Sequence, residues 1–207
     1  MNITRIRIHN FRSIIDSDIE AHHFSILVGA NNAGKSNFIN ALRCFYGDLK
    51  WADDDFPQNI NTNDEESWIE LSFDLRDDEW QVLDDKYKTN DAQQILILKR
   101  YFKGDKAKPR QNNIYAIVNG KEQEELFYGA KTNNATNCGR IVYIPALTNP
   151  DEQLKTSGPS PLRELLNYIL KTALPQNTAY DQLKQAFEPG LPHLKIPLTL
   201  VKGFDSR

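Results

Sequence analysis

The stretch that most constrains the fold of this chain is GANNAGKS, at residues 29–36. It fits the pattern G-x-x-x-x-G-K-[ST], in which glycines let the backbone curl so that consecutive N–H groups point at phosphate oxygens. The apolar run before it predicts a buried strand over 24–28, and apolar side chains recur at helical spacing after it. Strand, loop and helix in this order predict a phosphate-binding site at the start of the helix.

The chemistry of phosphate binding gives each residue of the loop a role. Gly29 and Gly34 shape the turn, and Lys35 is expected to reach the β- and γ-phosphates of a nucleotide. The Ser36 hydroxyl is the expected Mg²⁺ ligand, so ATP and Mg²⁺ are the expected cofactors. The positive end of a helix that starts at Gly34 and stops near Gly47 adds to the attraction for phosphate. The residues predicted to line the nucleotide are Gly29, Asn31, Asn32, Ala33, Gly34, Lys35, Ser36 and Asn37.

The composition predicts a protein of the cytoplasm without a membrane span. No run approaches the roughly 18 apolar residues of a membrane span, and the N-terminus lacks the apolar core of a signal peptide. The two cysteines, Cys44 and Cys138, have no metal-type spacing and form no obvious disulfide framework. Cys44 falls on the core side of the predicted helix and is expected to be inert packing.

Charge is distributed unevenly along the chain. Residues 48–91 hold 15 acidic and 4 basic side chains, net −11, and their first part, WADDDFPQNINTNDEESW, is interpreted as a solvated loop. Residues 92–207 hold 16 basic and 10 acidic side chains, net +6, which leaves room for a polyanionic partner. The basic residues of 99–110 surround Tyr101 and Phe102 and could contact DNA, although a solvated hairpin arm is the stronger interpretation. They are Lys99, Arg100, Lys103, Lys106, Lys108 and Arg110.

Apolar periodicity predicts an α/β fold in which a mixed sheet wraps partly around the phosphate-loop helix. Strands are expected over 2–11, 67–75, 92–102, 112–118 and 139–147, with a hairpin turn at Asn119-Gly120. Helices are expected within 76–87, capped by Asp77 or Asp78, and over 160–174 and 177–187. His22 and His23 are expected in a loop.

Several motifs of complete nucleotide hydrolases are missing from the sequence. The D-x-x-G and N-K-x-D of GTPases do not occur, and neither does an LSGG-like signature. A Walker B carboxylate follows a run of apolar residues, but ILIL is followed by Lys99 and IVYI by Pro145, and Asp74 is expected to point outward from an amphipathic strand. The sequence therefore predicts one half of an ATP site, with no catalytic residue assigned.

Two blocks of sequence resemble a known family. The strand that ends in NFRS, followed closely by the phosphate loop, resembles the N-terminus of RecF/SMC-like ABC ATPases, and above all the OLD (overcoming lysogenisation defect) nucleases. Residues 139–172 resemble a strand-loop-helix of the same proteins. The resemblance implies that residues 1–207 form a single ATP-binding lobe, whereas a C-terminal lobe supplies the signature and Walker B groups and a Toprim domain the endonuclease. It also implies a homodimer that sandwiches ATP and acts on DNA.

The same resemblance places Arg12 of NFRS near the nucleotide, although the residues alone allow a surface arginine equally well. Gln58 and Gln153 are both candidates for the loop glutamine that touches Mg²⁺ in ABC ATPases. Two alternatives stay open. One is a self-contained P-loop kinase or nucleotide-binding module without DNA work, and the other is a non-catalytic interaction domain with a vestigial loop.

Overall fold

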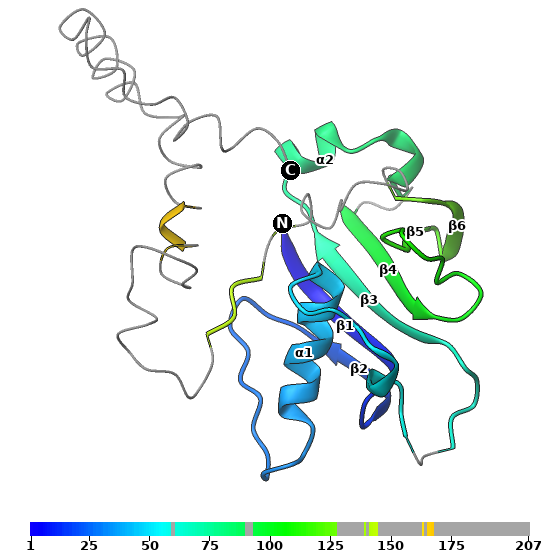
Figure 1. Cartoon of the computed structure of the whole chain (residues 1–207). Helices are drawn as coiled ribbons and strands as arrows, with labels where there is room; N and C mark the ends of the chain where they lie inside the picture. The colour runs from blue at the N-terminus through cyan, green and yellow to red at the C-terminus, as the bar shows by residue number, and fades with distance from the viewer. Residues whose placement is uncertain are drawn as a thin grey trace, which may run out of the picture. The chain divides into compact units, whose positions relative to one another are not determined.

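The computed structural model describes residues 1–58, 61–89, 93–127, 139, 141–144, 163 and 165–167. The chain divides into two compact units, Met1–Ile141 and Val142–Arg207. The first unit holds a sheet with a helix on one face (Figure 1). No helix of the described residues is long and apolar enough to cross a membrane.

The sheet of the first unit has six strands in the order β2-β1-β3-β4-β5-β6. Their bounds are β1 Asn2–Phe11, β2 Ile14–Glu20, β3 Ser67–Asp74, β4 Ile95–Lys103, β5 Ile114–Val118 and β6 Lys121–Leu126. Every neighbouring pair is antiparallel. The prediction of a mixed sheet is therefore wrong for the described residues. Tight hairpins join β1 to β2 and β5 to β6, whereas longer segments with helical turns connect β2 to β3 and β3 to β4.

Helix α1, Lys35–Tyr46, packs on one face of this sheet. It buries Phe38, Ala41, Cys44 and Phe45, which recur at helical spacing. Side chains alternate along each strand, so the buried set Ile6, Ile8, Ile69, Leu71, Phe73, Leu96, Leu98, Ile114 and Ala116 meets the helix from one side of the sheet. The helix ends as predicted, at Gly47, whose φ of 76° favours glycine.

Three short helical turns occupy the loops: η1 Asp53–Asp55, α2 Asp77–Val82 and η2 Asp85–Tyr87. The prediction that Asp77 or Asp78 caps α2 is wrong, because Arg76 is the N-cap residue. Its backbone N–H donates to Glu79 Oε2 at 3.0 Å. The Glu79 carboxylate, at the third position of the helix, thus satisfies the backbone N–H of the N-cap residue, as the glutamate of a capping box does.

Two predicted strands do not form in the described residues. The segment 24–28 has no regular structure, and Phe24, Ile26 and Val28 are 80%, 69% and 87% exposed. Residues 141–144 are also irregular, with Tyr143 and Ile144 exposed. In the part of the chain that the structure describes, neither segment has a neighbouring strand to pair with. Of the helix predicted over 160–174, Arg163 and residues 165–167 are helical, and the rest, like 145–147 and 177–187, lies outside the described residues.

Candidate phosphate-binding site

The phosphate loop connects the irregular segment 24–28 to α1. Two of its residues adopt left-handed backbone, Asn32 with φ 67° and Gly34 with φ 87°. The Ala33 N–H donates to the Ala30 carbonyl at 3.2 Å, which closes a turn inside the loop. Gly34 therefore needs the conformational freedom of glycine, because L-residues seldom adopt its left-handed backbone. Gly29 does not have a positive φ. A Cβ added at Gly29 would lie 3.4 Å from the Ala33 Cβ, at the edge of ordinary van der Waals contact, so the structure shows no requirement for glycine at this position.

The N-terminus of α1 presents free backbone donors beside this turn. The first helical hydrogen bond runs from the Phe38 N–H to the Gly34 carbonyl at 3.0 Å, and no side chain caps the helix. The N–H groups of Lys35, Ser36 and Asn37 precede that bond and have no acceptor within the helix. Together with the helix dipole they form a site suited to an anion.

Lys35 places a positive charge at the centre of the loop. Its Nζ donates to the carbonyl oxygens of Gly29 at 2.8 Å and Ala30 at 2.7 Å. A lysine ammonium has three N–H donors, and two of them bind these carbonyls. The third remains available to a ligand. Ser36, next along, is exposed, so its hydroxyl is accessible to a ligand.

The turn between β1 and β2 lies directly against the start of α1. Asn37 Nδ2 donates to Ser13 Oγ at 2.9 Å, and a Cβ on Gly34 would lie 3.4 Å from the same oxygen. Arg12 Nη1 lies 3.4 Å from Asn37 Oδ1. The fold thus brings Arg12 to the first turn of the phosphate-loop helix.

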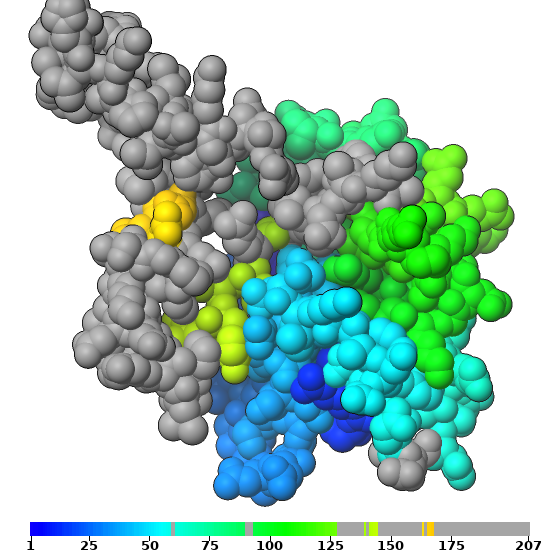
Figure 2. Space-filling view, in the orientation of Figure 1, coloured from blue at the N-terminus to red at the C-terminus, as the bar shows by residue number. Residues whose placement is uncertain are grey.

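Asp55 is a residue of this site that sequence reasoning missed. It sits in the acidic segment that was predicted to be solvated, yet it is 6% exposed, whereas Asp53 and Asp54 are exposed as expected. Its Oδ1 accepts from Arg12 Nε at 2.7 Å, and its backbone carbonyl accepts from the Arg12 N–H at 2.6 Å. The interpretation of the whole segment as a solvated loop is therefore wrong at Asp55. Figure 2 shows α1 and the segment up to residue 58, in blue and cyan, as adjoining patches of one face.

Most cations of the predicted basic arm contact groups of the chain itself. Arg100 Nη1 donates to the Cys44 and Phe45 carbonyls at 3.1 and 2.6 Å, so it caps the C-terminus of α1. Lys99 lies 3.8 Å from the Trp68 ring centroid, and Lys103 lies 3.7 Å from that of Phe56. Lys106 pairs with Glu122. These contacts favour the hairpin-arm interpretation over a free DNA-binding surface.

The sequence also singled out Asp74, Cys44 and two glutamines. Asp74 is exposed at the end of β3, as predicted. The Gln58 amide donates to the Phe56 carbonyl at 3.1 Å, which turns it back onto its own loop, and Gln153 lies outside the described residues. Cys44 is 1% exposed, and this burial raises the pKa of its thiol to about 12. It is an unreactive core residue, as predicted.

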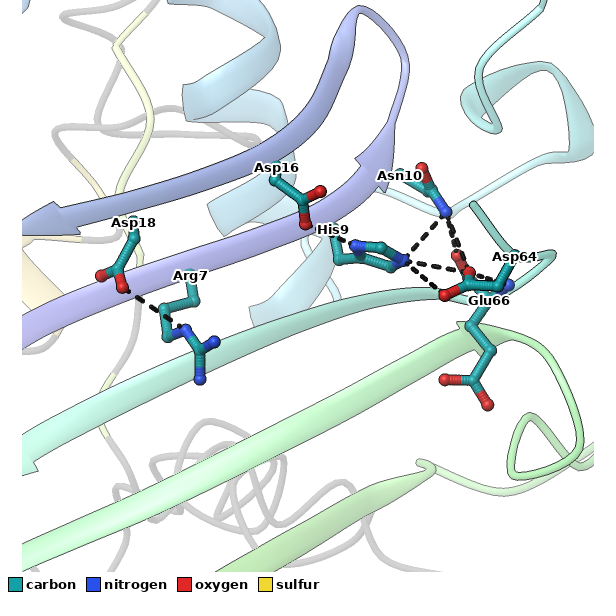
Figure 3. A network of polar contacts seen from close by, with 7 residues as sticks. All are labelled: Arg7, His9, Asn10, Asp16, Asp18, Asp64 and Glu66. Atoms are coloured by element: carbon teal, nitrogen blue, oxygen red, sulfur yellow. Dashed lines mark hydrogen bonds and ion pairs between the residues drawn. The ribbon is translucent and has the colours of Figure 1, made fainter. Parts of the chain in front are cut away.

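A partly buried polar network, drawn in Figure 3, holds the end of β1 that leads into the Arg12 turn. His9, 7% exposed, lies between two carboxylates, with Nδ1 2.6 Å from Asp16 Oδ1 and Nε2 3.0 Å from Asp64 Oδ1. Asn10 Nδ2 donates to the same Asp64 oxygen at 3.1 Å and to the Glu66 carbonyl at 2.9 Å. Burial disfavours the charged imidazolium, but the hydrogen bonds that it donates to the Asp16 and Asp64 carboxylates outweigh this cost, so the pKa of His9 lies above its ordinary value.

This network predicts that the stability of the domain depends on pH. Because the pKa of His9 is raised by folding, its contribution is complete below about pH 6.5 and is lost as pH rises through the folded-state value. We expect His9→Gln to lower the free energy of unfolding by about 1–2 kcal/mol at pH 6, where it breaks charge-assisted hydrogen bonds, and by less at pH 9. Urea unfolding at several pH values measures this. The exposed His23→Gln variant is the control, and an equal loss at both pH values would contradict the prediction.

This chain is similar to known ATPases in sequence and in structure. A family model described as "AAA ATPase domain" matches residues 1–157, so the chain belongs to the AAA ATPase domain family. Among solved structures, an SMC ATPase, described with ATP-driven dimerisation and DNA-stimulated activation, is 18% identical, with 59% of this chain and 72% of that chain covered and a TM-score of 0.43. The recombination mediator RecF with ATP is 16% identical, with coverages of 88% and 42% and a TM-score of 0.39. No curated protein matches the sequence significantly.

Proposed function

We propose that this chain is the ATP-binding lobe of an ABC-type ATPase of the OLD kind, which works in the cytoplasm as part of a larger DNA-acting protein. The observation that carries the proposal is the phosphate loop at the N-terminus of α1, with Lys35 over the loop and the Arg12 turn against the helix. Membership of the AAA ATPase domain family supports ATP as the nucleotide.

The described residues suggest how ATP would be held. The free N–H groups of Lys35, Ser36 and Asn37 would donate to phosphate oxygens, and the residues from Gly29 to Gly34 would curve around them. Lys35 would exchange its contacts with the loop carbonyls for the β- and γ-phosphates. Arg12 would add a second cation at the same end of the helix.

The site would bind Mg²⁺ only together with a nucleotide, whose phosphates would supply further oxygen ligands. Ser36 offers an exposed hydroxyl, a hard oxygen ligand of the kind that Mg²⁺ prefers. No group of three histidine, cysteine, aspartate or glutamate side chains among the described residues could hold a metal ion. When bound, Mg²⁺ would neutralise charge on the phosphates, and Ser36 would orient it there.

The wider roles follow from the family resemblance. In proteins of that kind two heads sandwich ATP, and the nucleotide governs dimer closure and access to DNA. We therefore propose a homodimer, DNA as the partner, and an endonuclease activity that depends on groups beyond those identified in this sequence. The Walker B carboxylate and the signature would come from another polypeptide segment.

This assignment predicts that the 207 residues alone release almost no phosphate from ATP. The phosphate loop binds and neutralises charge, whereas hydrolysis needs a carboxylate that holds the metal and positions water. We expect phosphate release with ATP and Mg²⁺ to equal that of the Lys35→Ala variant. Release should appear when the polypeptide carrying the signature and Walker B groups is added, and disappear again with Lys35→Ala.

A self-contained kinase-like module is the second candidate, because it would bind ATP through the same phosphate loop. It predicts the opposite result, namely ATP consumption by the 207 residues alone that is lost in Lys35→Ala. That outcome would overturn the ABC-type proposal, but it would still support ATP binding by the phosphate loop.

A further inference from the structure

We propose that Asp55 is a positioning residue for the nucleotide site, which acts by fixing the guanidinium of Arg12 at the start of α1. The inference rests on the proposed function, since it assigns Asp55 a role in ATP binding. It concerns one carboxylate within the acidic run Asp53–Asp55, where the sequence gives no reason to distinguish the three.

Asp55 holds Arg12 by side chain and backbone together. Its Oδ1 accepts from Arg12 Nε at 2.7 Å, and its carbonyl accepts from the Arg12 N–H at 2.6 Å. The second carboxylate oxygen accepts from the Ala52 N–H at 2.9 Å, so the carboxylate is itself held at both oxygens. Figure 1 shows η1 beside the turn between β1 and β2, as these bonds require.

Arg12 needs such support, because it has the left-handed backbone, with φ 52°, that L-residues seldom adopt. Ordering its long side chain also costs conformational entropy. A rigid partner that already fixes the side chain lowers the part of this cost that falls on ligand binding. The Asp55 side chain is only 9% exposed, so its bond to Nε is shielded from solvent.

The geometry leaves the outer end of the guanidinium available. Asp55 engages Nε, while Nη1 lies 3.4 Å from Asn37 Oδ1, a long contact, and Nη2 has no acceptor among the described residues. The Arg12 side chain remains 32% exposed. An arginine held at Nε can present both terminal nitrogens to a phosphate, which suits its planar fork of donors.

Electrostatics alone predicts the opposite effect for Asp55. A carboxylate near an anion site repels the anion, so removal of its charge would strengthen ATP binding if Asp55 had no positioning role. Weaker binding after the removal of a negative charge is therefore the signature of positioning. Asp54, which is exposed on the same turn, supplies the matched control for charge.

A double-mutant cycle on ATP affinity tests the proposal in the 207-residue chain with Mg²⁺. We expect Asp55→Ala to weaken ATP binding about tenfold in the wild-type background and less than about twofold in the Arg12→Ala background, because the two residues act as one unit. Asp55→Asn keeps the shape of the side chain and serves if Asp55→Ala fails to fold; it should show the same dependence on Arg12. Asp54→Ala should leave the affinity unchanged or raise it.

Three outcomes would overturn the proposal. Equal losses in both backgrounds would assign Asp55 a purely structural role, and tighter binding in Asp55→Ala would assign it simple repulsion. Either result leaves the proposed function standing if Lys35→Ala still abolishes binding. No ATP binding by the wild-type chain would overturn the proposed function together with this inference.

Discussion

The variant Phe45→Ala is expected to lose about 3–5 kcal/mol of its free energy of unfolding, the usual cost of truncating a fully buried phenylalanine. Phe45 is 0% exposed and projects from the last turns of α1 into the core that the helix shares with the sheet. Its ring also contacts that of Tyr46 edge-on, with centroids 5.4 Å apart. The substitution removes the contacts that dock the helix and leaves a cavity in their place.

Urea unfolding followed by circular dichroism measures this loss. The control is Val82→Ala, a truncation at an 82% exposed position of α2, which should change the free energy of unfolding by less than about 0.5 kcal/mol. A loss below about 1 kcal/mol in Phe45→Ala would contradict the packing of α1 on the sheet. Since α1 carries the phosphate loop, that result would also remove the basis for the site's geometry.

Local signals predicted α1 well, because each of its determinants lies within a few residues. The apolar spacing that includes Phe38 and Phe45 predicts the helix and two of its buried residues, and Gly47 marks its end. Ile39, Leu42 and Tyr46, which share that spacing, are only partly buried. Local signals likewise predicted β1, whose alternation of isoleucines and arginines is visible in the sequence, and the hairpin at Asn119 and Gly120, both with positive φ.

Burial of the segment 24–28 could not be read from its composition. Its apolar residues predicted a buried strand, but burial depends on neighbours, and the described residues provide no strand beside it. Sheet pairing is a non-local property, so strong β-propensity gives no information about the partner. The prediction of a mixed sheet is wrong for the described residues for the same reason.

Charged residues were also misjudged where their partners lie far away in sequence. Arg100 belonged to an apparent basic patch, yet it donates to the carbonyls of Cys44 and Phe45, more than fifty residues earlier. Asp55 belonged to an apparent acidic loop, yet it pairs with Arg12. Charge counts describe composition, and only the fold shows which member of a run is buried and paired.

The central claim is that the loop at 29–36 binds ATP through its phosphates. Calorimetric titration of the wild-type chain and the Lys35→Ala variant with ATP and Mg²⁺ tests it most directly. Lys35 lies over the loop, with Nζ 2.8 and 2.7 Å from the Gly29 and Ala30 carbonyls, where it can turn to a phosphate. A charge-assisted hydrogen bond to phosphate contributes about 2–3 kcal/mol, which corresponds to a loss of about 30- to 150-fold in affinity.

The titration includes Lys50→Ala, which removes one positive charge from an exposed loop position beyond α1. We expect this control to bind ATP like the wild type, and circular dichroism should show that all three proteins are folded. Saturable binding by the wild type and by Lys50→Ala, together with the loss in Lys35→Ala, is the result the account predicts. Equal ATP affinity in the wild type and Lys35→Ala, or no binding by the folded wild type, would contradict it.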